Sequence, residues 1–356
     1  MSKKYQEIYQ KLYQDIHSHA LRNGEKLPSE TQMMEQYNVS RQTIRKALAV
    51  LEEDGLIRKS QGRGSVVQFK EQGLHTKRVA VLFYDLDTSV FPIVMHRIDT
   101  VLYEHNYTAS FYSTDGSINK ERNILQQLIQ TPVDGIIMYA SVFSPICCNL
   151  DLIQKIQSLG TKILFFDNWY ANPDLCRIPS ISIDNYSAPY QITKYLIDKG
   201  HTRIGGAYLS SALGHCSRYA GICNALMQCA GYFDPKAFLG VDREDTAEII
   251  HDPKVKELFS GIDAFVCTSG VLTPIMIEAL RLYGKGNLKT VVFFDEEQIP
   301  SIEGVDYIFL RHSSAEVGML CAEGILSLIN GEEIGSVQVP WQLSELSTIK
   351  DLPGFN

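Results

Sequence analysis

The stretch of sequence that decides the fold is residues 27–67, LPSETQMMEQYNVSRQTIRKALAVLEEDGLIRKSQGRGSVV. Near its start, Ser29 stands three residues before Gln32, which is the spacing of a capping box at the amino terminus of a helix. We expect this helix to continue to Tyr37 and residues 38–39 to form a turn. The spacing therefore predicts the first helix of a helix-turn-helix.

A second helix and a hairpin are predicted after this turn. Ser40 is the expected cap of the helix, and Gly55 is its expected carboxyl-terminal stop. Residues 56–59 and 66–67 are predicted strands, joined by the glycine-containing loop 60–64. Apolar residues recur at helical spacing along this helix and form a stripe that should face inward. They are Ile44, Ala47, Leu48 and Leu51.

An earlier helix completes the predicted domain. Its apolar residues also recur at helical spacing and are Ile8, Tyr9, Leu12 and Ile16. Helices followed by a hairpin in this order are typical of a winged helix-turn-helix, in which the hairpin is the wing. This fold predicts contact with double-stranded DNA, because a helix fits the major groove.

Polar residues of the second helix and of the wing are the candidates for DNA contact. The first turns of a recognition helix reach base edges, where Arg suits guanine and Gln suits adenine. On an isolated helix such residues are more often a solvated face, but the surrounding pattern favours DNA contact. The predicted DNA-binding residues are Lys4, Glu30, Arg41, Gln42, Thr43 and Arg45, with Gln61, Gly62 and Arg63 at the wing tip.

Two of these candidates have alternative roles. Lys4 either contacts phosphate or is only solvated. The carboxylate of Glu30 either accepts a hydrogen bond from cytosine or stabilises the amino terminus of its helix, and the sequence alone favours the second role.

The spacing of these residues is similar to that of a known family. The pattern S-E...Y-x-V-S-R-x-T-I-R-x-A-L...L...G-L-I...G-x-G-S-V-V extends over residues 1–70 and resembles the N-terminal domain of GntR-type bacterial regulators. The resemblance implies that the chain regulates transcription.

Composition and charge agree with this expectation. The chain has 356 residues, of which 45% are hydrophobic and 21% are charged, as in a soluble globular protein of two or three domains. No apolar run approaches the length of a membrane span and no secretory leader follows Met1, so we expect a cytoplasmic protein without membrane contact. The net charge is -8, but residues 1–70 hold 12 Lys and Arg against 8 Asp and Glu, or +4. The basic part is therefore the part that must meet phosphate.

Several motifs of other protein classes do not occur in the sequence. The eight cysteines include no C-x-x-C pair, which favours free thiols over a zinc site, so no metal and no cofactor is expected. G-x-S-x-G, G-x-x-x-x-G-K and H-E-x-x-H do not occur either, which argues against an enzyme.

The composition changes after residue 68. Residues 69–77 are polar and aperiodic, as expected of a linker. In residues 78–356, apolar strands alternate with amphipathic helices, which predicts an α/β domain with parallel sheets in two lobes. The predicted strands are 78–84, 108–112, 135–139, 163–166, 204–209, 264–267 and 291–294, and the predicted helices are 92–105, 119–130, 188–199, 219–230, 247–259 and 272–283.

Four motifs in this body resemble the effector domain of the LacI/GalR regulators, which is similar to periplasmic sugar-binding proteins. They are residues 133–137 (VDGII), 182–185 (SIDN), 201–205 (HTRIG) and 218–221 (RYAG). A GntR-type domain joined to such a body resembles the arabinose repressors of Gram-positive bacteria. The resemblance implies a cleft between two lobes, with chain crossings near Ile183, near residues 300–307 and after Asn330.

The resemblance also implies which residues face a sugar in this cleft. Arg218 and Asp167 match ligand-facing positions, and Phe91 matches a residue that closes the mouth of the cleft. Asn168 and Trp169, beside Asp167, would add a donor and an aromatic wall. A structural ion pair for Arg218 and a core position for Phe91 are the alternatives.

The chain departs from the family at one point of this site. The family usually has an Asn-Asp pair where this chain has Thr268-Ser269, so an expected carboxylate acceptor is missing. Asp295 either replaces it or has a structural role, and His215 either contacts the ligand or faces solvent. The predicted effector site is Phe91, Asp167, Asn168, Trp169, His215, Arg218, Ser269 and Asp295.

Together, these features predict a homodimeric transcriptional repressor that binds palindromic operator DNA and is released by a small sugar such as L-arabinose. The alternatives are a sensor whose ligand strengthens DNA binding, as co-repressor or activator, and a regulator with a non-sugar effector. Operator affinity with and without ligand distinguishes release from strengthening.

Overall fold

The structure of the protein is a computed structural model that describes residues 3–17, 21, 24–60, 64–67, 76–85, 90–141, 147–170, 172, 175, 177–210, 213–242, 249–284, 288–295 and 303–355. The chain divides into two compact units. One unit contains Met1–Arg78, Leu125–Asp134 and Leu150–Lys162, and the other contains Val79–Ile124, Gly135–Asn149 and Ile163–Asn356. No helix within the described ranges is both long and apolar enough to cross a membrane.

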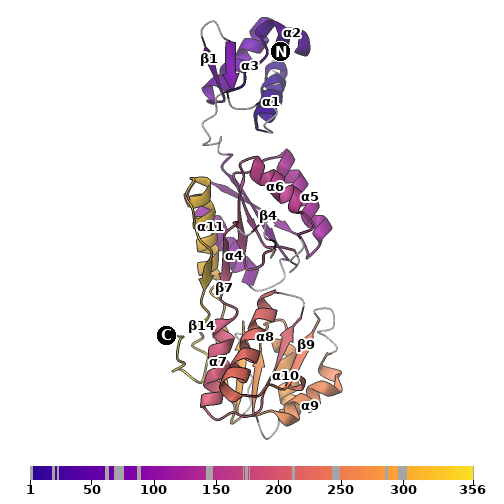
Figure 1. The fold of residues 1–356 in the computed structure, drawn as a ribbon, viewed down its shortest axis with the longest axis vertical. Coiled ribbons are helices and arrows are strands. Elements are labelled where there is room, and N and C mark those ends of the chain that lie inside the picture. Colours follow the sequence, from indigo (N-terminus) through magenta and orange to yellow (C-terminus); the bar gives the residue numbers. More distant parts are fainter. Residues whose placement is uncertain are drawn as a thin grey trace. The chain divides into compact units, whose positions relative to one another are not determined.

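The amino-terminal residues form the winged helix-turn-helix that the sequence predicts, which we call the head (Figure 1). Its elements are α1 (Lys3–His17), α2 (Glu30–Tyr37), α3 (Arg41–Glu53), β1 (Ile57–Ser60) and β2 (Gly64–Val67). The two strands pair antiparallel, and Val66 also bridges to Lys26, so a short third segment extends the wing.

The caps and the core of the head agree with the predictions. The expected stripe of α3 is buried against apolar residues of α1, among them Ile8 and Leu12. Ser29 Oγ accepts a hydrogen bond from the N–H of Gln32, and Gln32 Oε1 accepts one from the N–H of Ser29 at 2.8 Å, which confirms the capping box. Gly55 follows α3 with φ +71°, a left-handed conformation that suits glycine.

Replacing Ser29 by alanine is expected to destabilise the head by about 1 kcal/mol, because a backbone donor in the first turn of α2 loses its acceptor. Hydrogen exchange of the full chain would then be faster in α2 and unchanged in the rest of the protein. Ser29→Asp, which retains an acceptor, is the control and should exchange like the wild type. Equal protection of α2 in the alanine variant would contradict a stabilising role for the cap.

The first lobe of the effector body is a six-stranded sheet with the order β13-β7-β6-β5-β3-β4. Its strands are β3 (Arg78–Phe83), β4 (Thr108–Ser113), β5 (Gly135–Met138), β6 (Lys162–Phe166), β7 (Ser180–Ile183) and β13 (Val337–Val339). The pairs β3–β5, β6–β7 and β7–β13 are parallel. Its helices are α4 (Val90–Glu104), α5 (Ile118–Gln130), α6 (Leu150–Ser158) and α11 (Ser314–Ile329), of which α4 and α11 lie side by side (Figure 1).

The second lobe is a six-stranded sheet with the order β14-β12-β11-β10-β8-β9. Its strands are β8 (Ile204–Leu209), β9 (Phe238–Val241), β10 (Ala264–Cys267), β11 (Thr290–Phe294), β12 (Asp306–Arg311) and β14 (Gln342–Leu343). Only the β12–β14 pair is antiparallel among the pairs between described strands of this sheet. Its helices are α7 (Ser187–Asp198), α8 (Leu213–Ala225), α9 (Pro253–Gly261) and α10 (Thr273–Tyr283), with a π-helical turn at Leu226–Ala230 and 3-10 turns at Pro235–Ala237 and Ile249–His251.

The chain crosses between the two sheets after β7, after β12 and after β13. The first crossing lies next to Ile183, as expected. The expected crossing at residues 300–307 was wrong, because Asp306–Arg311 form strand β12 of the second lobe and the chain crosses at His312 and Ser313 instead. The last crossing, at Pro340 and Trp341, lies after Asn330 as expected.

Candidate DNA-binding face and effector site

The first turns of α3 present polar side chains to solvent. The side chains of Arg41 and Arg45 are 57% and 64% exposed, and Gln42 is exposed between them. Thr43 is half-buried, and its Oγ1 lies 2.9 Å from Ser40 Oγ at the helix cap. Arg41, Gln42 and Arg45 are therefore available to a DNA groove, whereas Thr43 contributes at least partly to the cap.

Glu30 lies in the first turn of α2 and contacts both arginines of α3. Arg45 Nε donates to the two carboxylate oxygens of Glu30 at 3.0 and 3.1 Å, and Arg41 Nε lies 3.6 Å from Oε2. Exposed ion pairs of this kind add little stability, about 0–1 kcal/mol. Their effect is to restrict the positions of the two guanidinium groups, which is a role that neither sequence-based interpretation of Glu30 included.

The other predicted DNA contacts are less defined. Lys4 is exposed on α1. Gln61, Gly62 and Arg63 at the wing tip, like most of the predicted linker, lie outside the described residues.

Arg218, on α8, is a buried cation between the two lobes. Only 7% of its side chain is exposed. Its Nε donates to Asn185 Oδ1 at 2.8 Å, and its Nη1 donates to the carbonyl oxygen of Thr268 at 2.5 Å. Burial lowers the pKa of this guanidinium, and the nearby carboxylates of Asp295 and Asp167 act in the opposite direction.

Asp167 and Asp295 occupy equivalent positions in the two lobes. Asp167 follows β6 with φ 51°, and Asp295 follows β11 with φ 65°, so both residues have the left-handed backbone that is uncommon outside glycine. In each case the backbone N–H donates to the neighbouring strand, to Ile181 or Leu310, at 2.9 Å. Asp295 Oδ2 lies 3.7 Å from Arg218 Nη1, so the predicted Arg218 and Asp295 positions are brought together.

Two further residues, His312 and Trp341, lie beside these charged groups and were not indicated by the sequence. His312 Nε2 lies 3.6 Å from Asp167 Oδ2, and the ring of Trp341 packs edge to face against that of His312. The Arg218 guanidinium lies over the Trp341 ring, 4.5 Å from its centre. We call the group of Asp167, Asn185, Arg218, Thr268, Asp295, His312 and Trp341 the interlobe cluster.

The remaining predicted effector residues surround this cluster or lie in the core. Asn168 is buried, with its Nδ2 donating to Ala140 O at 2.7 Å, and Trp169 is half-buried. His215 Nδ1 lies 3.2 Å from Thr268 O, the carbonyl that Arg218 also contacts. Ser269 is buried and its Oγ accepts from the N–H of Val271, which makes it a local turn residue before α10.

Phe91 packs in the first-lobe core. Its ring contacts those of Phe83, Tyr139 and Phe166, with centres 5.5–6.0 Å apart. It is 8% exposed. This geometry favours the core interpretation over closure of a cleft mouth.

The interlobe cluster contains the kinds of groups that bind polyhydroxyl ligands in proteins. Asp295 Oδ1 is buried and has no hydrogen-bond partner among the described residues. A buried acceptor without a donor costs about 1–3 kcal/mol, which a ligand hydroxyl could offset. Charged donors and acceptors beside aromatic rings are typical of such sites.

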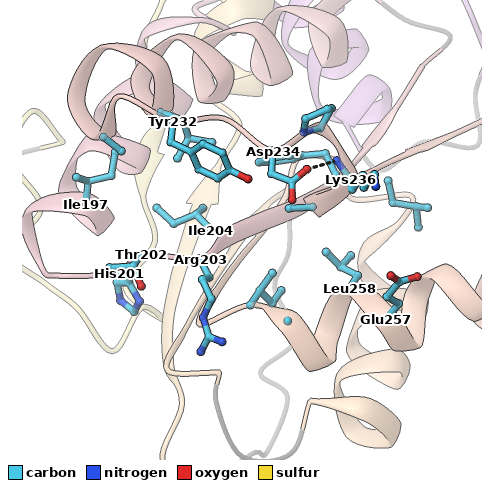
Figure 2. A pocket seen from close by; sticks show the side chains of 18 of the residues that line it. Ile197, His201, Thr202, Arg203, Ile204, Tyr232, Asp234, Lys236, Glu257 and Leu258 are labelled. Atoms are coloured by element: carbon cyan, nitrogen blue, oxygen red, sulfur yellow. Dashed lines mark hydrogen bonds between the residues drawn. The ribbon is translucent and has the colours of Figure 1, made fainter.

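A separate cavity of about 1070 Å³ lies in the second lobe, at the amino ends of strands β8 and β9 (Figure 2). His201, Thr202 and Arg203, just before β8, contribute to its lining, as does Lys236 before β9. The interlobe cluster lies beyond the carboxyl ends of these parallel strands, where ligands of α/β sheets usually bind. The cavity therefore includes none of the predicted effector residues.

Comparison with known proteins assigns the chain to a class. Residues 76–299, more than half of the chain, match the family described as periplasmic binding proteins and sugar binding domain of LacI family, and residues 4–67 match bacterial regulatory proteins of the gntR family. The chain therefore belongs to the family of periplasmic binding proteins and LacI-type sugar binding domains, with a GntR-type helix-turn-helix domain at its amino terminus.

Two curated relatives align with this chain along almost their full length. The arabinose metabolism transcriptional repressor of Geobacillus stearothermophilus is 24% identical, over 94% of this chain and 93% of that protein. The repressor of the same name from Halalkalibacterium halodurans is 23% identical, over 93% and 91%. The chain is thus a DNA-binding transcriptional regulator of combined GntR and LacI type, and not an enzyme.

Solved structures share the fold of the effector body. The Cra transcriptional dual regulator from Pseudomonas putida, in complex with fructose 1-phosphate, has a TM-score of 0.64 at 18% identity, covering 78% of this chain and 100% of that chain. The complex of the transcriptional regulator CelR with cellobiose has a TM-score of 0.63 at 16% identity, covering 86% and 90%. At these identities the likeness concerns the fold alone.

Proposed function

We propose that the protein is a homodimeric repressor that binds palindromic operator DNA through residues 1–68 and is released by a small sugar, such as L-arabinose. The sugar binds at the interlobe cluster of the effector body, residues 78–356, and residues 69–77 link the two parts. The observation that carries this proposal is the Oδ1 atom of Asp295, which has no hydrogen-bond partner within the part of the chain that the structure describes and lies beside the buried guanidinium of Arg218.

The chemistry of the cluster favours a neutral polyol as ligand. Arg218 is already engaged with Asn185, Thr268 and Asp295, so its charge is largely matched within the protein. The second carboxylate, Asp167, adds acceptor capacity and negative charge. Hydroxyl groups satisfy such acceptors, whereas an anionic ligand would be repelled by the two carboxylates.

L-arabinose is proposed because of the relatives. Two proteins named arabinose metabolism transcriptional repressors align with the chain from the head through the effector body. A pentose also has enough hydroxyls to contact both carboxylates of the cluster.

The head supports operator recognition. Arg41, Gln42 and Arg45 extend from the start of α3, where a recognition helix meets base edges. Two heads related by a two-fold axis would read two half-sites of opposite orientation, and the operator would therefore be a palindrome.

Release requires that the sugar stabilises one arrangement of the lobes over another. The interlobe cluster takes residues from both lobes and from the crossings at His312 and Trp341, so a ligand bound there contacts the segments on which the lobes would turn. Such coupling is typically worth about 1–3 kcal/mol.

The experiment combines a thermal-shift screen with an operator-binding titration. L-arabinose at about 100 times its Kd should stabilise the native state by roughly 2.7 kcal/mol, and it should weaken operator binding by about 5- to 150-fold. D-arabinose, D-xylose, D-ribose and hexoses serve as stereochemical controls. Tighter operator binding with sugar would establish a co-repressor or activator instead, and no shift with any sugar would refute a sugar effector.

A further inference from the structure

In each lobe, one Asp carboxylate accepts hydrogen bonds from the residues that lead into the first strand. We call this arrangement a carboxylate clamp. In the first lobe, Asp134 Oδ1 accepts from the N–H and the Oγ1 of Thr76 at 2.6 and 2.7 Å, and Oδ2 accepts from the N–H of Lys77 at 3.0 Å. In the second lobe, Asp263 Oδ2 accepts from the N–H and the Oγ1 of Thr202, both at 3.2 Å.

The second clamp is completed like the first. The N–H of Arg203 donates to both oxygens of Asp263 at 3.3 Å. The sequence repeats with the structure, since residues 75–77 are HTK and residues 201–203 are HTR. Each segment leads directly into the first strand of its lobe, β3 or β8, and each Asp directly precedes a paired parallel strand, β5 or β10.

The two clamps differ in the segment that each carboxylate binds. Asp263 holds chain that arrives from α7, within the effector body. Asp134 holds the end of the segment that comes from the head. Lys77 also has φ 54°, whereas Arg203 is not among the described residues with positive φ. A left-handed lysine costs about 1–2 kcal/mol, so the bonds from Asp134 fix a chain direction that the free segment would not adopt.

We propose that Asp134 is a positioning residue that transmits the state of the first lobe to the DNA-binding head. The inference rests on the proposed function, because it concerns how sugar binding reaches the DNA. Three hydrogen bonds to one carboxylate tie the last linker residues to the start of β5. A movement of that strand then turns the linker with it. Without the clamp, the linker gains two freely rotating residues, which would absorb the movement.

The test compares Asp134→Ala with the matched variant Asp263→Ala in the full chain. Each variant loses the acceptor of three donor groups. Asp263→Ala also loses a contact of 4.0 Å to the Arg203 guanidinium and one of 3.3 Å to His201, and Asp134→Ala also loses an electrostatic interaction with Tyr13 of α1. Sugar Kd is measured by calorimetry, and operator Kd is measured with and without L-arabinose. We expect both variants to bind sugar and free operator like the wild type, within about 3-fold. In the wild type and in Asp263→Ala, L-arabinose should raise the operator Kd by about 5- to 150-fold. In Asp134→Ala, it should raise the operator Kd by less than about 2-fold.

A second pair of variants is used if loss of the Asp carboxylate unfolds a lobe. Thr76→Val and Thr202→Val each remove one hydroxyl donor with almost no change of shape, and only Thr76→Val should reduce the rise in operator Kd. A wild-type rise in both Asp134→Ala and Thr76→Val would overturn the inference. An equal loss in the second-lobe variants would overturn it as well, because the clamp would then be a general support of the fold. A wild type that ignores every sugar would refute the proposed function itself, and this is seen before any variant is made.

Discussion

Replacing Arg218 by alanine is expected to give a regulator that still binds its operator but no longer responds to sugar. The side chain lies in the effector body and belongs to none of the DNA-binding elements, so operator affinity without sugar should stay within about 2-fold of the wild type. Sugar binding should be lost, because the guanidinium is the buried cation around which the described part of the interlobe cluster is built.

The expected loss in sugar affinity is large. A hydrogen bond between a ligand hydroxyl and a charged group contributes about 1.5–3 kcal/mol, which corresponds to roughly 10- to 150-fold in Kd. Calorimetry with L-arabinose measures this directly. The same truncation leaves Asp295 without its cation and should lower thermal stability, so unfolding temperatures must be recorded for each variant.

Arg218→Lys is the matched control for charge. It retains the cation near Asp295 but lacks the planar fork that reaches Asn185 and Thr268 together. We expect intermediate sugar affinity and near-normal stability. An Arg218→Ala protein that is folded and releases DNA at the wild-type sugar concentration would remove Arg218 from the effector site and the interlobe cluster from the proposed function.

Replacing Arg45 by alanine is expected to weaken operator binding by about 1–3 kcal/mol, or roughly 5- to 150-fold. The guanidinium is well exposed at the start of α3, and Glu30 restricts its position from the neighbouring helix. A side chain held in this way loses little entropy when it meets a base edge. Binding measured on the operator and on unrelated DNA separates specific from non-specific affinity.

Lys4→Ala is the comparison for this variant. A lysine that contacts only phosphate should lower affinity evenly on both DNAs and reduce the salt dependence of binding by about one ion. Arg45→Ala should instead reduce the discrimination between the two. If Arg45→Ala and Arg41→Ala both bound the operator like the wild type, or if footprinting detected no palindrome, the recognition-helix assignment would be wrong.

The parts of the fold that depend on short-range patterns could be predicted from the sequence. The stripe of α3 and the capping box at Ser29 lie within a few residues of each other, and both are confirmed. Apolar strands such as β8 and β10 were located to the residue, because strands buried on both faces form continuous apolar runs.

Elements that depend on distant partners were missed. Helix α11 is buried on several sides and contains Gly318. A Cβ atom at this position would lie 2.7 Å from the carbonyl oxygen of Val94 on α4, which is too close for any residue but glycine. The helix therefore lacks a clear amphipathic period, and its glycines resemble helix breakers. Strands β13 and β14 are too short to show a period and exist only through pairing with β7 and β12.

The candidate site was predicted in the same uneven way. The family resemblance indicates Arg218 and Asp167, and the position of Asp295 directly after an apolar strand indicates this residue as a candidate acceptor. The structure brings Arg218 and Asp295 together. His312 and Trp341 belong to no local motif, since the crossings between lobes bring them to the cluster. The family resemblance places this crossing at residues 300–307, several residues before His312.

The order of the crossings has a consequence for synthesis on the ribosome. The head is continuous in sequence and can fold as soon as it emerges, as amino-terminal domains generally do. The first lobe must wait for α11 and β13, which follow nearly all of the second-lobe strands and cover α4, β5 and β7. A nascent chain that ends before Ser314 would therefore carry a folded head attached to an incomplete sheet. Its uncovered apolar face should make such truncated products insoluble.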